Sequence, residues 1–157
     1  MGLGRFGGGV GVARYLARLG SRVVVTDLVP EAELAEPVDA IGDLISAGAV
    51  RLRLGEHREE DFAGADLVIA NPAVPRPWAN RFLKAAHDAG VPITTEIRLA
   101  VERLPDPERT VGITGSAGKS TTSAMIAHCL RAAGLSTRLG GNIGGSLLDE
   151  VESFGPG

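Results

Sequence analysis

Residues 112–121 carry the residue types of a loop that binds nucleotide phosphates. They read Gly-Ile-Thr-Gly-Ser-Ala-Gly-Lys-Ser-Thr and lie between a segment typical of a strand and one typical of a helix. Small residues let successive backbone N–H groups turn toward phosphate oxygens. Lys119 adds a positive charge, and the Ser120 hydroxyl suits Mg²⁺, which prefers oxygen ligands. The strict pattern places glycine at Ile113, so the prediction depends on the flanking elements.

This interpretation predicts ATP and Mg²⁺ as ligands, with Ser120 on the metal and Lys119 as the catalytic cation. The alternative is a chance Gly-Lys-Ser sequence in an ordinary strand-turn-helix. The predicted ATP contacts are Gly115, Ser116, Ala117, Gly118, Lys119, Ser120 and Thr121.

A second glycine pattern opens the chain. Gly2, Gly4 and Gly7 match G-x-G-x-x-G, and Asp27 follows at the end of the next predicted strand. In a dinucleotide fold such an acid binds a ribose hydroxyl, so the pattern fits an NAD site, and it also fits glycines that serve only close helix packing. The pattern requires a preceding strand, yet only Met1 precedes it. We therefore expect the first strand to be missing from this chain.

The elements around these loops alternate in type. Hydrophobic periodicity and glycine or proline punctuation predict helices over 10–19, 38–47, 77–89, 96–104 and 119–133, and strands over 22–26, 50–54, 66–70, 91–94 and 110–113. Such alternation predicts an α/β fold with a Rossmann-like, doubly wound parallel sheet, whose ligands bind beyond the carboxyl ends of the strands. The proline-marked stretch 105–109 predicts a boundary between a domain of residues 1–104 and the start of a P-loop domain, truncated, over 105–157.

Composition excludes several classes of partner. A net charge of -3 gives no basic excess for nucleic acid or an anionic membrane. No apolar run approaches the roughly 20 residues of a membrane span, and we expect no export signal. Cys129 is the single cysteine, which excludes an internal disulfide and a multi-cysteine zinc site and favours a reducing, cytoplasmic location.

Several other residues are predicted to be structural. The three histidines, His57, His87 and His128, have no metal-ligand spacing and are predicted to pack or lie on the surface. Cys129 is predicted to be a buried, inert thiol. Trp78 is predicted to pack instead of covering a base. The charged run over residues 58–61 is predicted to be solvated.

The phosphate loop followed by Gly-Gly-Asn-Ile-Gly at residues 140–144 resembles the Mur ligases, in particular their D-glutamate-adding members. The resemblance extends back through residues 71–74, 65–68 and 54–57 to the first glycine loop. Three positions depart from the family pattern. They are Ala117 in place of asparagine, Asn71 in place of serine and Ala73 in place of glycine.

The resemblance implies that the Rossmann-like first domain holds UDP, not NAD, and that the second domain is the ATPase of the family. It further implies roles for individual residues. The implied substrate contacts are Gly4, Arg5 and Phe6 at the pyrophosphate, Asp27 at the uracil or ribose, Asn71 in the nucleotide region and Asn142 at the muramoyl part.

The implied reaction is an ATP-dependent amide ligation in peptidoglycan-precursor synthesis. ATP phosphorylates the alanine carboxylate of UDP-N-acetylmuramoyl-L-alanine, and the amine of D-glutamate attacks the acyl phosphate. By resemblance, acidic Mg²⁺ ligands, a modified lysine and an amino-acid-binding domain belong after residue 157. We therefore expect these residues alone to be inactive. We also expect a monomer. Two alternatives remain, an NAD-dependent oxidoreductase and a non-catalytic nucleotide-binding module.

Overall fold

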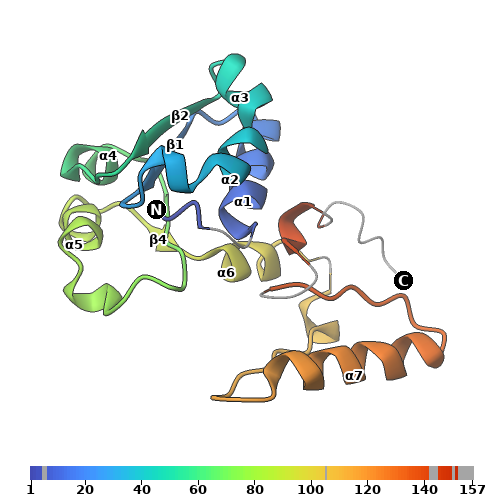
Figure 1. The fold of residues 1–157 in the computed structure, drawn as a ribbon. Helices are drawn as coiled ribbons and strands as arrows, with labels where there is room; N and C mark the ends of the chain where they lie inside the picture. Colours follow the sequence, from blue (N-terminus) through green and yellow to red (C-terminus); the bar gives the residue numbers. More distant parts are fainter. Residues whose placement is uncertain (5–6, 105, 142–144, 150, 152–157) are drawn as a thin grey trace.

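The computed structural model describes residues 1–4, 7–104, 106–141, 145–149 and 151. Its strands form two parallel pairs with helices around them (Figure 1). β1 (Val23–Asp27) pairs with β2 (Val50–Leu54) in full register, and β3 (Val68–Ile69) pairs with β4 (Ile93–Thr94). The β-branched run that forms β1 suits a strand packed between layers. The parallel pairing confirms the α/β class predicted from the alternation of elements.

Residues 1 and 2 join the two strand pairs. The N–H group of Gly2 donates a hydrogen bond to the carbonyl oxygen of Thr26 in β1 (2.7 Å). On the other side, the terminal ammonium of Met1 donates to Ile69 in β3 (2.8 Å), and Asn71 N–H donates to the Met1 carbonyl (3.0 Å). The spatial order is therefore β2, β1, residues 1–2, β3, β4. If residues 1–2 count as the first strand, this is the strand order of a Rossmann-like sheet.

Helices and single 3-10 turns connect these strands. The α-helices are α1 (Gly8–Arg18), α2 (Ala35–Asp39), α3 (Gly42–Ser46), α4 (Glu59–Ala63), α5 (Arg81–Asp88), α6 (Glu96–Val101) and α7 (Lys119–Ala132). The 3-10 turns are η1 (Glu31–Glu33), η2 (Pro77–Ala79), η3 (Pro107–Arg109) and η4 (Leu147–Asp149).

Three clusters of buried side chains make up the core of the described chain. The first packs α1 against β1, β2 and the segment of α2 and α3, with Leu3 and Ile41 at its centre. The second packs α4 and α5 against β3 around Phe62. The third brings α1, α6 and η4 together around Tyr15 and Leu148. The third cluster thus contains residues from near both ends of the chain.

The predicted helix over 38–47 is two short helices. α2 ends at Asp39 and α3 begins at Gly42, and Ile41 between them has a non-helical backbone (φ -123°, ψ 15°) and is fully buried. The predicted helix over 77–89 is likewise divided, because Asn80 ends η2 and caps α5. The Asn80 side chain accepts hydrogen bonds from the N–H groups of Phe82 and Leu83.

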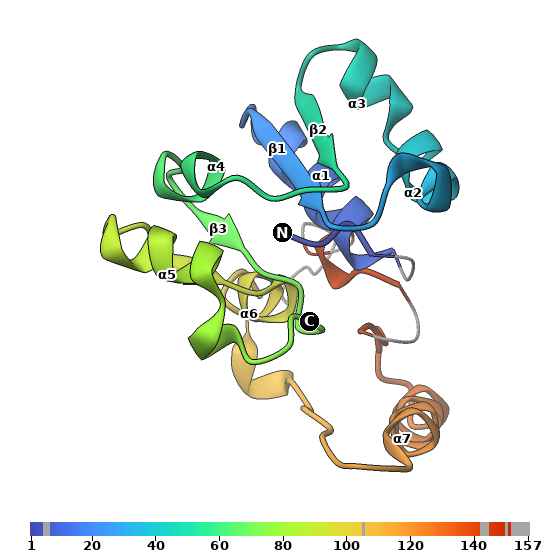
Figure 2. The ribbon, with the colours of Figure 1, turned by 60° about the vertical axis from the view of Figure 1, so that its left-hand side comes forward.

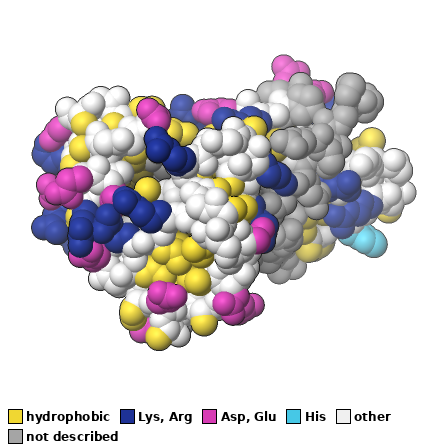
Figure 3. Space-filling view, turned by 90° about the horizontal axis from the view of Figure 1, so that it is seen from above, with side chains coloured by type: hydrophobic (Ala, Val, Ile, Leu, Met, Phe, Trp, Pro, Cys, Tyr) yellow, Lys and Arg dark blue, Asp and Glu magenta, His cyan; other side chains and the backbone are white. Residues whose placement is uncertain are grey.

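The first three residues of the charged run over 58–61, at the start of α4, are exposed as predicted, but Asp61 is not. Asp61 is almost buried and forms ion pairs with Arg53 and Arg51 of β2, while the next residue, Phe62, enters the core. The hydrogen bond from Arg53 to Asp61 raises the pKa of the guanidinium. Acidic and basic side chains lie beside one another on the face drawn in Figure 3, in keeping with the low net charge.

The strand predicted over 110–113 is wrong. This segment has no strand partner among the described residues, and Val111 is exposed. A strand exists only when a neighbour takes up its backbone hydrogen bonds, and the described strands all precede α6. α7 lies apart from the strand-containing body (Figures 1 and 2), and of its residues only Ala127 is buried. In the described chain, no helix is both long and apolar enough to span a membrane.

The buried amino group between β1 and β3 predicts a pH-dependent stability. Burial lowers the pKa of the Met1 amine from 8.0 to about 6, against the opposing effect of Asp27. As the pH falls below 8, the unfolded chain takes up this proton before the folded chain does. The free energy of unfolding should therefore fall by about 2 kcal/mol between pH 8 and pH 6. Burial also lowers the pKa of His57 from 6.5, which adds a loss of the same sign at lower pH.

Urea unfolding of the chain beginning at Met1, followed between pH 5 and pH 9, measures this change. A chain acetylated at Met1 is the control, because it lacks the titrating amine and should retain only the contribution of His57. Equal stability at pH 6 and pH 8 without acetylation would contradict the prediction.

Candidate functional site

The glycine loop, Asp27 and Asn71 meet at the carboxyl edge of the sheet, next to residues 1 and 2. This is the point at which the strand order reverses direction, where ligands of open α/β sheets bind. The Asp27 carboxylate is almost buried there. One oxygen accepts hydrogen bonds from the N–H groups of Leu3 (2.8 Å) and Gly4 (3.2 Å), and the other accepts from Val29 (3.0 Å). Asp27 therefore fixes the backbone of the glycine loop.

Asn71 packs directly against this loop. A Cβ atom on Gly2 would lie 2.8 Å from the Asn71 Cβ, and one on Gly4 would lie 3.2 Å from its amide nitrogen. Both glycines also have positive φ angles, 82° and 66°, which favour glycine. The Asn71 side-chain oxygen accepts a hydrogen bond from the N–H of Ala73 (2.9 Å). The structure thus brings Gly4, Asp27 and Asn71 together as predicted, while Arg5 and Phe6 lie outside the described residues.

The amino end of α1 begins at the same edge. Gly7, with φ 85°, is its N-cap, and the first turn presents backbone N–H groups that favour anions. A Cβ atom on Gly9 would overlap the carbonyl oxygen of Leu3, and one on Gly8 would overlap the Glu96 carboxylate. Glu96 and Gly9 belong to no motif that predicts a function from the sequence. Glu96 follows β4 and therefore lies at the carboxyl end of a strand, where ligands bind, and this position could have marked it as a candidate.

His57 lies behind this edge. Its Nδ1 atom contacts the hydroxyl of Thr26, which also donates to the carbonyl oxygen of Glu56 (3.3 Å). The imidazole packs edge-on against Phe62 and Phe82, with ring centroids 5.7 and 5.0 Å away. Burial, and then the charge of the Met1 ammonium, lower the pKa of His57. The prediction of a packing role for His57 is confirmed.

The second glycine loop leads into α7. Gly118 is the N-cap, with φ 76°, and its carbonyl oxygen accepts a hydrogen bond from Thr122 N–H (2.9 Å). The Lys119 ammonium folds back and donates to the carbonyl oxygen of Gly115 (2.6 Å). Ser120 follows in the first turn of the helix, so the cation and the hydroxyl both lie at the end of α7 that favours phosphate.

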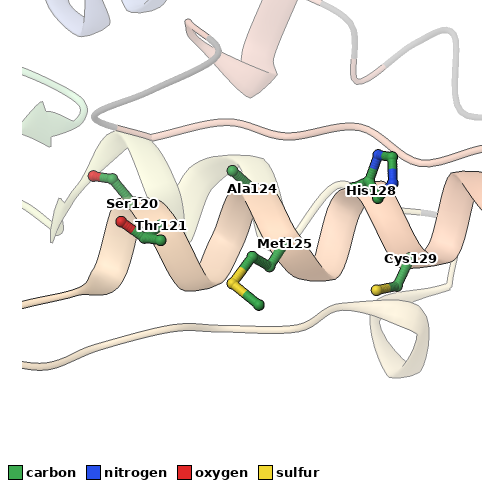
Figure 4. A pocket seen from close by; sticks show the side chains of 6 residues that line it. All are labelled: Ser120, Thr121, Ala124, Met125, His128 and Cys129. Atoms are coloured by element: carbon green, nitrogen blue, oxygen red, sulfur yellow. The ribbon is translucent and has the colours of Figure 1, made fainter.

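Ser120 and Thr121 also begin a shallow hollow that runs along α7 (Figure 4). The other lining residues are Ala124, Met125, His128 and Cys129. Cys129 is exposed, so the prediction of a buried thiol is wrong. Trp78 on η2 is also 82% exposed, against the prediction that it packs. Both errors concern side chains whose environment depends on neighbours far away in the sequence.

The remaining candidates are only partly described. Asn142 lies outside the described residues, while Gly140, Gly141 and Gly145 of the same segment lie within them. The described residues hold no cluster of three or more His, Cys, Asp and Glu side chains able to bind a metal ion. Ser120, the single metal contact predicted from the sequence, lies within the described residues.

Two glycine loops, each leading into the amino end of a helix, define an α/β chain with two candidate nucleotide sites. No family model matches the chain. Over 144 residues it is 44% identical to the UDP-N-acetylmuramoylalanine–D-glutamate ligase of Geobacter metallireducens, covering 92% of this chain and 30% of that enzyme. It is 40% identical over 154 residues to the enzyme of the same name from Roseiflexus sp., covering 98% of the chain and 31% of the relative.

The ligase of Borreliella burgdorferi is similar over 159 aligned residues at 39% identity, which covers 99% of the chain and 33% of the enzyme. The resemblance to the Mur ligases is thus confirmed, since the chain is homologous over nearly its whole length to D-glutamate ligases of this family. It spans about a third of the length of these relatives.

The close packing at the amino end of α1 predicts an asymmetric response to two alanine substitutions. Gly9→Ala should lower the free energy of unfolding by about 1–3 kcal/mol, because the new methyl group meets the backbone of Leu3, which Asp27 holds in place. Gly42→Ala, in the first turn of α3 with nothing within 4 Å, should change it by less than about 0.5 kcal/mol or stabilise the chain. Urea unfolding measures both, and equal effects would contradict the packing described.

Proposed function

We propose that this chain is the nucleotide-binding part of an ATP-dependent ligase that joins D-glutamate to UDP-N-acetylmuramoyl-L-alanine in peptidoglycan-precursor synthesis. One observation carries the proposal. Two glycine loops, at the amino ends of α1 and α7, occur in a chain that is 39–44% identical to ligases named for this reaction. A single nucleotide would leave one of the two loops without a role.

The first loop is the proposed site for the UDP part of the substrate. The amino end of α1 and the backbone near Gly4 suit the pyrophosphate, with Arg5 and Phe6 beside it by resemblance. Asp27 accepts three backbone hydrogen bonds, and a carboxylate has about four acceptor positions. We therefore propose that Asp27 both holds the loop and accepts one further hydrogen bond from the ribose or uracil. Asn71 lies against the same loop and completes this site.

The second loop is the proposed site for ATP with Mg²⁺. Residues 115–121 suit phosphate, because Gly118 turns the backbone into α7 and Lys119 already lies against the loop. Ala117 lacks the side chain usual in the family, but its N–H group remains available. The Ser120 hydroxyl is the proposed metal contact. Mg²⁺, when bound, supplies positive charge to the transferring phosphoryl group.

In the proposed reaction, an oxygen of the alanine carboxylate attacks the γ-phosphorus of ATP and ADP leaves. The D-glutamate amine then attacks the acyl carbon, phosphate leaves, and the amine loses a proton. Lys119 compensates the charge that develops on the phosphoryl oxygens, and both loops hold the reactants in place. D-glutamate is assigned by resemblance to a further domain, so nucleotide binding without turnover is the activity proposed for these 157 residues alone, as a cytoplasmic monomer.

Ligand preference separates this proposal from an NAD-dependent oxidoreductase. We expect calorimetry to show UDP binding at least about tenfold tighter than NAD binding. Asp27→Ala should weaken UDP binding by about tenfold or more, because both the loop and a direct contact are lost. Asp66→Ala is the control, since Asp66 is an exposed aspartate at the opposite edge of the sheet, just before β3. NAD binding without a UDP response would favour the oxidoreductase.

Lys119 tests the ATP site. The assay uses the Geobacter metallireducens ligase with its matching segment replaced by this chain. Lys119→Ala should lower phosphate release by about 10²–10³-fold, while UDP binding should stay unchanged because its loop lies on α1. Lys84→Ala is the matched control, since this exposed lysine of α5 pairs only locally, with Asp88. Unaltered phosphate release after Lys119→Ala would exclude the second loop as the ATP site.

A further inference from the structure

The glycine-rich element is the Gly-Gly-Asn-Ile-Gly sequence at residues 140–144, and η4, which follows it, docks on the body formed by the first part of the chain. η4 lies against α1 and α6, as both ribbon views show (Figures 1 and 2). Leu148 of η4 is fully buried there, together with Leu99 and Ala100 of α6 and Tyr15 of α1. Val151, the next described residue after η4, is buried in the same cluster. The contact crosses the predicted domain boundary, and its residues Tyr15 and Leu148 lie more than a hundred positions apart.

Polar contacts fix the orientation of this docking. The Arg18 guanidinium donates a hydrogen bond to the carbonyl oxygen of Leu148 (3.1 Å). It also lies over the Tyr15 ring, 5.9 Å from the centroid, and the Arg103 guanidinium lies 5.5 Å from that centroid. Arg103 in turn donates to the carbonyl oxygen of Leu99 (3.1 Å). Leu148 therefore sits in a socket formed by Tyr15, Leu99 and Ala100, where the Arg18 hydrogen bond holds its backbone and the Arg103 hydrogen bond braces α6.

η4, which places Leu148 in the socket, also packs against the glycine-rich element. Gly141 N–H donates a hydrogen bond to the carbonyl oxygen of Gly145, the residue that follows this element (3.2 Å). A Cβ atom on Gly140 would overlap the side chain of Leu147. The ends of the element thus lie directly against η4, and Leu148 holds η4 on α1 and α6.

We propose that Leu148 is a positioning residue that fixes the loop ends at Gly141 and Gly145 relative to the UDP site, so that one substrate contacts both parts of the chain. This inference rests on the proposed function, which assigns UDP to the loop before α1, and on the muramoyl contact that the family resemblance implies for the glycine-rich element at residues 140–144. Leu148 does not contact the substrate in this arrangement. It acts by keeping the element docked while the substrate binds.

Comparison of two ligands on the 157-residue chain tests the inference. UDP requires only the loop before α1, whereas UDP-N-acetylmuramoyl-L-alanine requires both parts. Leu148→Ala should leave the Kd of UDP unchanged and reduce the additional affinity for UDP-N-acetylmuramoyl-L-alanine by about tenfold, as expected if the docked state becomes a tenth populated. Leu148→Met conserves the side-chain volume and should restore that affinity. Leu135→Ala, an exposed leucine outside the cluster, is the matched control.

The outcomes are distinct. Retention of the additional affinity in Leu148→Ala, or equal weakening of both ligands, would overturn the positioning role. If Leu148→Ala does not fold, Arg18→Ala removes only the hydrogen bond and its contact with Tyr15, and it should show a smaller loss confined to the larger ligand. An unchanged ratio in Arg18→Ala would then overturn the inference. An unsubstituted chain that binds UDP with no additional affinity for the larger ligand would overturn it too, whereas one that binds neither ligand would reject the proposed function itself.

Discussion

The backbone hydrogen bonds of residues 1 and 2 hold the two strand pairs together. Gly2 bonds to β1 on one side and Met1 bonds to β3 on the other, so the sheet is continuous only through these residues. The Asp27 carboxylate then binds the next two backbone N–H groups and fixes the direction in which the chain leaves the sheet. The start of α1, the position of the glycine loop and the candidate UDP site all depend on this arrangement.

The two glycine loops have different surroundings although each precedes a helix. In the loop before α1, Asn71 occupies the space of a Cβ atom on Gly2 and crowds one on Gly4. At the start of α1, Glu96 and the Leu3 backbone do the same for Gly8 and Gly9. Around Gly118, by contrast, there is nothing within 4 Å, and the positive φ angle alone favours glycine there. The first loop is shaped by packing, and the second by its own backbone and by Lys119.

Hydrophobic periodicity predicted the existence and type of most elements because it reports which face of a segment is buried. It failed where burial depends on a distant partner. Asp61 looked solvated, yet it is buried against Arg53 on the neighbouring strand. Residues 110–113 have the composition of a strand, but no described strand pairs with them. Cys129 and Trp78 looked like packing residues, yet no other element covers either side chain in the described chain.

The sequence by itself determined the α/β class, both glycine loops and the resemblance to the Mur ligases, which also pointed to Gly4, Asp27 and Asn71 as contacts of one nucleotide. The class and the loops follow from local spacing, and their place at the ligand-binding edge follows from the rule that parallel strands place their carboxyl ends together. The roles of single residues follow only from the resemblance. Only the tertiary structure decided that Asp27 binds the loop backbone and that Leu148 enters a socket on α1 and α6. Hydrogen bonds and contacts between residues 24 to more than a hundred positions apart leave no periodic pattern, because they depend on how the chain folds back on itself.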